Sequence, residues 1–431
     1  LIQFFFSYDS QIFMSMAKTR AFRFLWARVV ESYSNDRELQ CAQIFARSSL
    51  RMLSLYDPWT NILRTTSATM GAALSDIPVI ETFSFDRAIN ESYNNENSEY
   101  FTIARRLSRN ISHILSEESY LSKVLDPAGG SYFLEALTLD FNQRAWAIFQ
   151  DIERQGGMVN CLKSGKIQQW VEETREKRRS KIQKRQDIIT GVNNFANPKE
   201  NFFDKCSPKE EESFHVELKD CDPKLTKNIV EASRNYKPFD LSSKLMGEVL
   251  LEAYAKGFSF SKAAQILHSQ SEVDRIQSLN KFRSAQAYED LRQKCELKNI
   301  KLRAIVSLII QGDYAELSSR INFIKNIFET LGLSVEEVLA GSPLSQSKMS
   351  EAKINICVLV ANNEEYPNLV VDFLSLSTKH DAYAYLAGKM DEELLDSLQE
   401  KGIIDNLYSG QNIYQVLENL VHRMEKDYEE N

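Results

Sequence analysis

Cysteine and histidine, which often ligate metals or act in catalysis, are few and scattered in this chain of 431 residues. The six cysteines and five histidines are Cys41, Cys161, Cys206, Cys221, Cys295 and Cys357, and His113, His215, His268, His380 and His422. No two cysteines have C-x-x-C spacing and no two histidines have H-x-x-x-H spacing, so the sequence predicts no metal site. In a long acidic chain that does not begin with a signal peptide, we expect the cysteines to be reduced thiols.

Motifs that would hold a phosphate or activate a nucleophile are also missing. A phosphate cradle needs clustered glycines that open a helix, because backbone N–H groups must approach the anion. A single glycine, Gly312, follows the strand expected at residues 301–311, and no serine lies in a G-x-S-x-G elbow. Asp313 and Glu316 beside that glycine are interpreted as capping residues rather than as catalytic groups. Composition and spacing alone therefore predict no active site.

The overall charge excludes some classes of function. With 52 basic and 60 acidic residues the net charge is −8, which argues against a broad nucleic-acid-binding surface. No apolar stretch approaches the ~20 residues of a membrane-spanning helix. The first residues, LIQFFF, lack the basic flank and cleavage site of a signal peptide. We expect a cytoplasmic protein.

The elements that would position functional groups alternate between strand and helix near both ends of the chain. Strands are predicted at residues 2–7, 40–47 and 77–83, and helices at 13–33, 57–74 and 99–117, with Asp57 as N-cap and Pro58 at the first helical position. Alternation of this kind indicates parallel strands with helical crossovers. Since a βα barrel needs eight such units, this segment is either a small open sheet or the last part of a barrel.

The middle of the chain is predicted to be helical and irregular, and the end to form a second sheet. Helices are expected at 136–155, 167–186, 242–256, 259–269 and 273–294, with a polar linker at 197–223. Five strands at 301–311, 333–339, 353–361, 381–387 and 403–408 alternate with helices at 314–331, 364–377, 391–401 and 412–428. This order is typical of a flavodoxin-like open sheet, whose ligands bind beyond the carboxyl ends of the strands.

Specific motifs then resemble one family. The segment FMSMAKTRAFRFLWA at residues 13–27 is similar to the pattern F-M-E-I-A-K-x-R-A-x-R-x-L-W-A of methylmalonyl-CoA mutases. Further matches follow in family order: NILRTT at 61–66, ARRLSRN at 104–110, DPAGGSY at 126–132 and GVN at 191–193. By these residues the chain is identified as a member of that family, most like the small (β) subunit of the heterodimeric bacterial enzyme.

The resemblance implies an α/β fold in four parts. Residues 1–118 would be the last three units of a (β/α)8 TIM barrel whose first five units lie outside this sequence. Residues 119–225 would be wrapping helices and linker, 226–296 a helical connector, and 297–431 a degenerate cobalamin-binding-like, flavodoxin-fold domain. In the family, the barrel binds acyl-CoA and the last domain binds adenosylcobalamin. Together they interconvert methylmalonyl-CoA and succinyl-CoA by radical chemistry, in propionate metabolism.

The residues that the family uses on its substrate are replaced here. Where the family's lining strand reads R-L-S-F-F-W, this chain has Leu1 at the arginine and Gln3 at the serine, while Phe5 keeps an aromatic. Leucine offers neither charge nor donor to a phosphate or carboxylate. In the next lining strand, G-G-T-Q-S-L-H-T-N, the glutamine position is Pro78 and the histidine position is Glu81, which would repel an acyl-CoA carboxylate. We therefore expect no catalytic residue and no substrate-binding residue.

The cofactor loop of the family, D-x-H-x-x-G, is replaced as well. Its histidine ligates cobalt and its aspartate orients that histidine. Anchored on FETLG at 328–332, the three positions fall on Ala315, Leu317 and Arg320. The resemblance thus implies a non-catalytic small subunit that stabilises a catalytic large subunit, with adenosylcobalamin and acyl-CoA in that partner. Two alternatives stay open: a divergent catalytic acyl-CoA mutase, and a truncated assembly factor or gene remnant.

Overall fold

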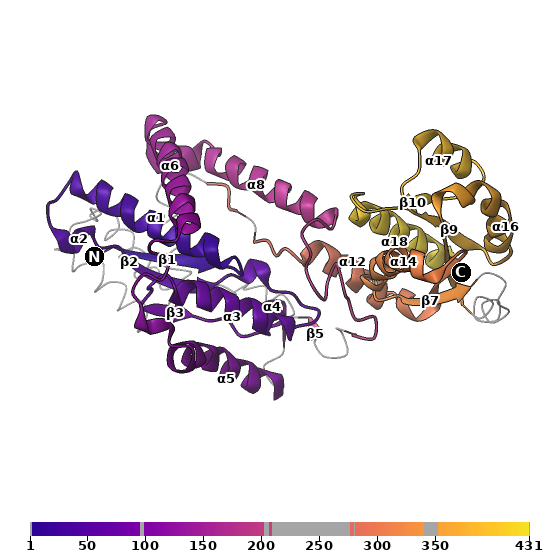
Figure 1. Cartoon of the computed structure of the whole chain (residues 1–431), viewed down its shortest axis with the longest axis horizontal. Helices are drawn as coiled ribbons and strands as arrows, with labels where there is room; N and C mark the ends of the chain where they lie inside the picture. Colours follow the sequence, from indigo (N-terminus) through magenta and orange to yellow (C-terminus); the bar gives the residue numbers. More distant parts are fainter. Residues whose placement is uncertain are drawn as a thin grey trace, which may run out of the picture. The chain divides into compact units, whose positions relative to one another are not determined.

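The computed structural model describes residues 2–94, 99–201, 207–208, 276–279, 281–339 and 352–430. The chain divides into two compact units, one formed by Leu1–Asp151, Val171–Pro208 and Asn280–Asn431, the other by Ile152–Trp170 and Lys209–Leu279. The mixed α/β class expected from the sequence is confirmed by parallel sheets with helical crossovers (Figure 1). In the described part of the chain, no helix combines the length and the apolar character needed to cross a membrane. The helices expected at 242–256 and 259–269 lie outside the described residues.

The first sheet has three parallel strands, β1 (Gln3–Tyr8), β2 (Gln43–Ser48) and β3 (Val79–Glu81), in the order β1-β2-β3. The crossovers are made by α1 (Ile12–Glu31), the short α2 (Arg37–Gln40), and α3 (Thr60–Ala73). Alternation along the strands buries one face: Tyr8, Ile44 and Ala46 pack with Ala68 and other apolar residues. The opposite face has no such cover among the described residues, and Phe5 on it is 68% exposed.

The segment after this sheet is mainly helical. It contains α4 (Arg87–Ser92), α5 (Glu99–His113) with a π-helical turn at Ile114–Glu118, α6 (Tyr132–Arg154), α7 (Gly157–Lys163) and α8 (Lys166–Gln183). Two-residue strands β4 (Tyr93–Asn94) and β5 (Ser207–Pro208) pair antiparallel. The helices predicted at 136–155 and 167–186 are confirmed. The sequence analysis missed α7. Gly156 and Gly157 end α6 with positive φ and turn the chain directly into this new helix.

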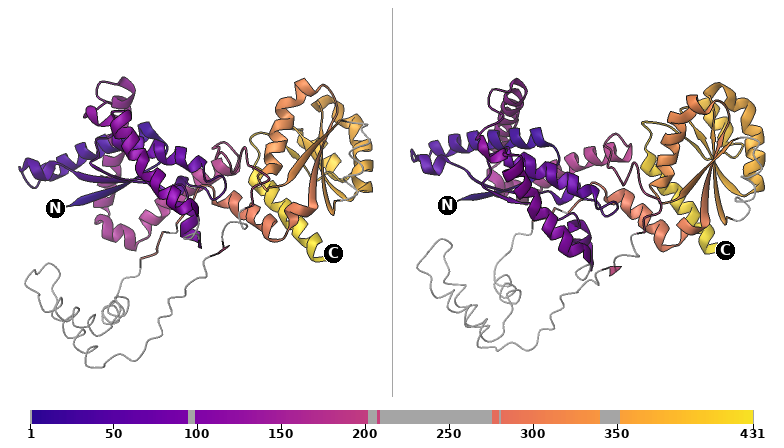
Figure 2. Two further views of the ribbon diagram at one scale, coloured as in Figure 1. Left: turned by 90° about the horizontal axis from the view of Figure 1, so that it is seen from below. Right: turned by 60° about the horizontal axis from the view of Figure 1, so that its bottom comes forward.

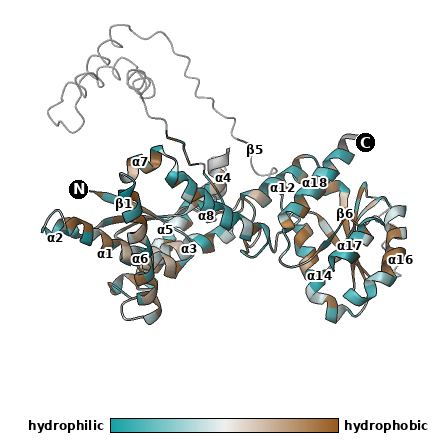
Figure 3. Cartoon of the chain, turned by 90° about the horizontal axis from the view of Figure 1, so that it is seen from above, coloured by the Kyte–Doolittle hydropathy of each residue, from teal (hydrophilic) through white to brown (hydrophobic). Residues whose placement is uncertain are grey.

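The second sheet has five parallel strands in the order β10-β9-β8-β6-β7. Its strands are β6 (Ala304–Ile310), β7 (Ser334–Leu339), β8 (Ile354–Val360), β9 (Ala382–Ala387) and β10 (Asp405–Leu407). Helices α14 (Tyr314–Glu329), α16 (Tyr366–Lys379) and α17 (Glu392–Gln399) lie between strands, and α18 (Ile413–Glu430) follows β10. Helices lie on both sides of the sheet (Figure 2). The central strand β8 is therefore buried along its whole length and apolar throughout, apart from Asn355. The hydrophobic colouring of the sheet around β6 reflects the same burial (Figure 3).

Helices α12 (Gln286–Leu297) and α13 (Ile300–Arg303) precede β6. A buried charged cluster joins α12 to the loop that follows β2. Arg292 pairs with Glu296 (Nε to Oε1, 3.2 Å) and lies over the ring of Tyr56, whose hydroxyl donates to Glu296 Oε2 at 3.0 Å. The Arg292 Nη2 group also donates to the carbonyls of Asn197 (2.7 Å) and Glu200 (2.8 Å). Opposite charges and neighbouring dipoles offset much of the cost of burying this ion pair, although Arg292 Nη1 has no hydrogen-bond partner.

Two expectations about helix starts are wrong. The helix expected from Asp57 begins at Thr60, because Asp57 itself has φ +47° and its N–H donates to the carboxylate of Glu200. The helix expected at 273–294 begins at Gln286, because the preceding residues are bound elsewhere: the Ser284 N–H donates to the Arg51 carbonyl at 2.9 Å.

Gly191, in the GVN motif, packs closely against Asp57, and substitution of this glycine tests that contact. A Cβ at Gly191 (φ +82°) would lie 2.5 Å from Asp57 Cβ, whereas a Cβ at Gly130 (φ +81°) would meet nothing within 4 Å. Gly191→Ala should lower the free energy of unfolding by roughly 2–4 kcal/mol, from backbone strain plus steric overlap. Gly130→Ala, the control with strain alone, should cost about 1 kcal/mol in urea denaturation. Equal losses would contradict the packing argument.

Candidate functional site

The first candidate site is the carboxyl edge of the five-stranded sheet, between β6 and β8, where successive connections leave in opposite directions. At this edge, groups of the chain form hydrogen bonds with the ends of the strands. The Gln311 N–H donates to the Val360 carbonyl at 3.0 Å, which ties the end of β6 to the end of β8. Tyr366 is fully buried; its hydroxyl donates to the Ala387 carbonyl and accepts from the Ala361 N–H at 3.2 Å. The ends of three neighbouring strands are thus linked by protein groups.

Arg320 adds two further hydrogen bonds to these strand ends, and we call the whole set of contacts the closure of the carboxyl edge. From the second turn of α14, its Nη1 donates to the carbonyls of Ala361 and Ala387, the latter at 3.2 Å. A Cβ at Gly388 would lie 3.1 Å from the same Nη1, so the guanidinium sits directly against the turn after β9. The residue expected at the glycine of the cofactor loop therefore fills the carboxyl edge with a long cationic side chain.

The other two cofactor-loop positions lie elsewhere. Leu317 is 2% exposed and belongs to the core between α14 and the sheet, while Ala315 is exposed in the first turn of α14. The predicted capping role of Asp313 is confirmed, because its carboxylate accepts from the Ala315 N–H at 2.7 Å. Residues 315–320 are thus helix from the start, with no loop that could extend over a ligand.

The chemistry of this edge does not fit an imidazole-ligated corrin. None of residues 311–320, 361–366, 387–391 and 408–412 is a histidine. Within the described ranges, no group of three or more His, Cys, Asp and Glu side chains could hold a metal ion. The cysteines are free at the described positions, which are Cys41, Cys161, Cys295 and Cys357.

The second candidate site is the bare face of the three-stranded sheet. It brings together three of the positions singled out in the sequence: Gln3 and Phe5 on β1 and Glu81 on β3. Pro78 is exposed just before β3, and Leu1 lies outside the described residues. The register places β2 between them, so that Phe5 stacks on Phe45 with ring centroids 5.3 Å apart.

An arginine that the sequence analysis did not single out also lies on this face. Arg47 is opposite Glu81 in the β2–β3 register, and the two side chains form an ion pair at 3.7 Å. Both groups are more than half exposed, so the pair adds little stability. The period-two spacing of Gln43, Phe45 and Arg47 was the signal that could have placed Arg47 on this face.

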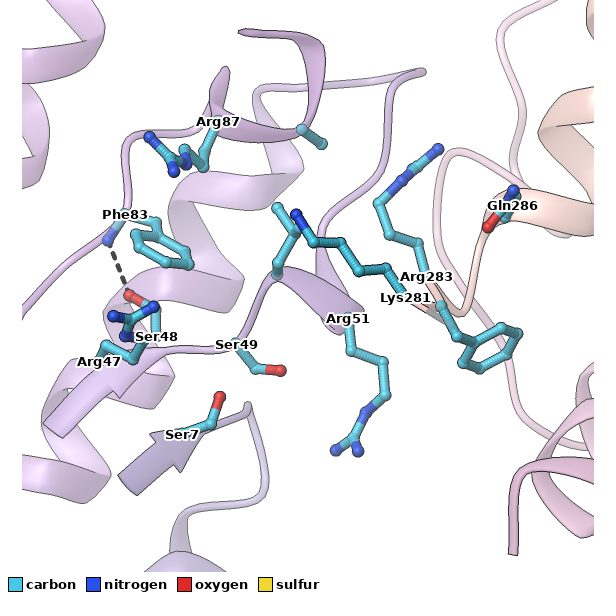
Figure 4. A pocket seen from close by; sticks show the side chains of 13 residues that line it. Ser7, Arg47, Ser48, Ser49, Arg51, Phe83, Arg87, Lys281, Arg283 and Gln286 are labelled. Atoms are coloured by element: carbon cyan, nitrogen blue, oxygen red, sulfur yellow. Dashed lines mark hydrogen bonds between the residues drawn. The ribbon is translucent and has the colours of Figure 1, made fainter. Parts of the chain in front are cut away.

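A pocket of about 600 Å³ opens where β1 and β2 end (Figure 4). Its lining combines the strand ends, α4 and the segment before α12, and it contains five cationic side chains: Arg47, Arg51, Arg87, Lys281 and Arg283. The sequence analysis did not predict this cluster, because its members come from segments up to about 230 positions apart and carry no common motif.

Arg51 is one of several cations that lie near Asp9. Its guanidinium pairs with Asp9 at 2.8 Å. Burial lowers the pKa of Lys18, and Arg51 lowers it further although Asp9 opposes the shift. Burial likewise lowers the pKa of the Arg178 guanidinium, again with repulsion from Arg51. For both side chains burial is the main cause, and the charges of Arg51 and Asp9 act in opposite directions.

Comparison with known proteins gives a consistent result. A family model described as methylmalonyl-CoA mutase matches residues 1–232. The methylmalonyl-CoA mutase small subunit of Streptomyces virginiae is 38% identical over 194 residues, which cover 45% of this chain and 30% of that protein. The small subunit of Porphyromonas gingivalis is 26% identical over 426 residues, covering 96% of this chain and 57% of that protein. The large subunit of the same organism is 31% identical over 204 residues, 47% of this chain and 27% of that protein. The chain thus spans well under two thirds of the length of these relatives.

The Arg320 contacts predict a measurable loss when they are removed. Arg320→Met keeps an unbranched apolar stem and deletes the guanidinium that donates to two strand-end carbonyls. The free energy of unfolding should fall by about 1–3 kcal/mol, since the carbonyls lose charged partners. The control Lys401→Met, at an exposed turn, should change it by less than about 0.5 kcal/mol. Urea denaturation followed by circular dichroism measures both, and an unchanged midpoint for Arg320→Met would contradict the closure.

Proposed function

The chain belongs to the methylmalonyl-CoA mutase family, and we propose that within it the chain is a small subunit that does no catalysis itself and stabilises a catalytic large subunit. The reaction of the whole enzyme would be the interconversion of methylmalonyl-CoA and succinyl-CoA. Adenosylcobalamin would be the cofactor of that enzyme, held by the large subunit.

The observation that carries this proposal is the occupied edge of the five-stranded sheet. We propose that residues 297–431 are a flavodoxin-like domain of the cobalamin-binding type that has lost its cofactor. The strand order and the helices on both faces support the fold, while the contacts of Arg320 and Tyr366 with the strand ends support the loss of binding. For a ligand to enter here, the chain would first have to break these hydrogen bonds, and leaving buried carbonyls unpaired is unfavourable.

We propose further that residues 1–118 are the last three units of a TIM barrel, with 119–225 as wrapping helices and linker and 226–296 as a connector. The parallel order β1-β2-β3 and the uncovered face carrying Phe5 and Val79 support this assignment, because the inner face of a barrel is covered only when the ring closes. On this face Gln3 and Glu81 stand where the family has serine and histidine. A substrate carboxylate would meet Glu81 rather than an imidazole.

The partner is proposed from the same features and from the names of the relatives, which include small and large mutase subunits. Phe5 and Val79 are exposed, with the half-buried Phe45 between them, and an apolar surface of this kind associates with another protein segment. The free thiols of the described cysteines suit a reducing compartment, which supports a cytoplasmic location for the complex.

Cobalamin binding tests the proposal directly. The purified chain, titrated with adenosylcobalamin and followed by its visible absorption, should show no saturable change, whereas a catalytic large subunit in a parallel titration should bind. Stoichiometric binding by this chain would overturn the proposal and favour a divergent catalytic mutase.

Co-expression tests the stabilising role. With the large subunit of the same organism, the two chains should elute together in size-exclusion chromatography. The thermal unfolding temperature of the large subunit should rise, because binding to the native state adds to its stability. Mutase activity should come from the complex and not from this chain. Separate elution would contradict a subunit role and favour the assembly-factor or gene-remnant alternatives.

A further inference from the structure

Helix α6 buries little of its own surface, although it carries many apolar side chains. Leu134 is its one buried residue, whereas Tyr132, Phe133 and Leu139 are 94%, 61% and 58% exposed. Tyr132 and Leu139 are two turns apart and therefore lie on the same face of the helix. A helix on the surface of a globular protein normally turns its apolar side chains toward the core and polar ones toward solvent, so the outer face of α6 departs from the usual pattern.

Helix α6 is held in a defined position on α1, which it crosses (Figure 1). Arg20 on α1 forms an ion pair with Glu135 at 2.8 Å and donates to Thr138 Oγ1 at 3.1 Å. Near the start of both helices the rings of Phe13 and Phe133 meet edge to face, with centroids 5.8 Å apart. The side chains that the two helices expose are thus organised before a partner arrives, which reduces the entropy lost on binding.

A groove of about 580 Å³ opens beside the Arg20 ion pair, between α1 and α6. Its lining includes Phe24 from α1, Leu125 from the loop before α6, and Leu139, and these three side chains are 63%, 79% and 58% exposed. Phe13 lies on the same face of α1 as Phe24, about three turns earlier. We call the exposed apolar side chains around this groove the α1–α6 surface, and they are Phe13, Phe24, Leu125, Tyr132, Phe133 and Leu139.

The apolar area of the α1–α6 surface is large for a protein without a partner. Because an aromatic side chain has ~150–250 Å² of surface and the six residues are 57–94% exposed, together they present roughly 700 Å². The largest apolar patch of a typical monomer is about 300–600 Å², and each partner of a stable complex contributes about 800 Å². The α1–α6 surface therefore has the size of a protein–protein interface.

The charges in the groove indicate which partner fits. Arg20 is shared between two carboxylates, Asp126 and Glu135, and Arg23 donates to the backbone carbonyl of Asp76 at 2.6 Å. The lining thus has three carboxylates and two guanidinium groups, and among the described residues no side chain forms an ion pair with the exposed carboxylate of Asp76.

This arrangement disfavours a second copy of the chain as the partner. In a two-fold symmetric dimer the same patch meets itself, so the carboxylates of one groove would face those of the other, and like charges across an interface are unfavourable. A different chain can instead bring a lysine or arginine to Asp76 and cover the apolar side chains around it.

We propose that the α1–α6 surface is a docking site for the large subunit, which would cover it with an apolar segment carrying one basic side chain that pairs with Asp76. This inference rests on the proposed subunit role. It adds a second contact region to the bare face of the three-stranded sheet, because α1 packs on the opposite face of that sheet through Phe22.

Binding of purified variants to the large subunit of the same organism, measured by biolayer interferometry, tests the docking site. Leu125→Ser and Leu139→Ser remove exposed apolar side chains, and each should raise the Kd by about tenfold. Asp76→Asn should raise it by about fivefold, through loss of the ion pair to the partner. As matched controls on α16, Val371→Ser, at a side chain 65% exposed, and Asp372→Asn should leave the Kd unchanged. Circular dichroism shows whether each variant is folded.

The outcomes separate this surface from the subunit role. If the unaltered chain binds the large subunit and the three folded variants bind equally well, the docking site is overturned while the subunit role stands. If the unaltered chain does not bind, both are overturned. Equal losses in the α16 controls would also overturn the site. Sedimentation of the chain alone as a dimer that Leu139→Ser dissociates would identify a second copy as the occupant and overturn the proposal.

Discussion

Parallel sheets are stable when both faces are covered, and this constraint separates the two main sheets of the described structure. In the five-stranded sheet, β6 and β8 are buried between helices on both sides. In the three-stranded sheet, helices cover one face, while Phe5 and Val79 on the other are 68% and 51% exposed. In the described residues, the three-stranded sheet thus has one apolar face without a covering layer, whereas both faces of the five-stranded sheet are covered by helices. The proposed association with a partner and the proposed loss of cofactor follow from these two conditions.

The completeness of the second sheet has a chemical reason. Its carboxyl edge, where a ligand of such a sheet would lie, is occupied by groups of the same chain: the guanidinium of Arg320 and the phenol of Tyr366. Intramolecular groups of this kind are present at a very high local concentration and lose little freedom when they bind. The proposed replacement of the family's glycine by Arg320 would therefore do more than remove a small residue, since the guanidinium would occupy the site permanently.

The extent to which the sequence predicted these features differs between elements. The strands of the second sheet are confirmed to within about two residues at most ends, because buried parallel strands are long apolar runs. Helix starts were less predictable: Asp57 has the composition of an N-cap, but a distant carboxylate, Glu200, binds its N–H and moves the start to Thr60.

For the functional sites too, the sequence identified single positions but not the contacts between them. Leu317 and Arg320 were singled out from the sequence as replaced positions, and Gln3, Phe5 and Glu81 as barrel-lining positions. The structure places these three on one face of the three-stranded sheet, and a barrel lining stays a prediction. That Arg320 reaches two strand ends, and that Arg47, Arg87 and Lys281 share one pocket, depends on contacts between segments far apart in the chain. Local patterns carry no information of that kind.

The Arg292 cluster has a consequence for the order in which the chain folds. Its partners, Tyr56 and the carbonyls near residue 200, are about 240 and 90 positions away, so closing these loops is entropically slow. Until they close, Arg292 and Glu296 can form their ion pair only within α12, and their remaining polar atoms are hydrated. Burial of the pair becomes favourable only when its partners have arrived, so we expect the packing of α12 against the loop after β2 to be a late step of folding.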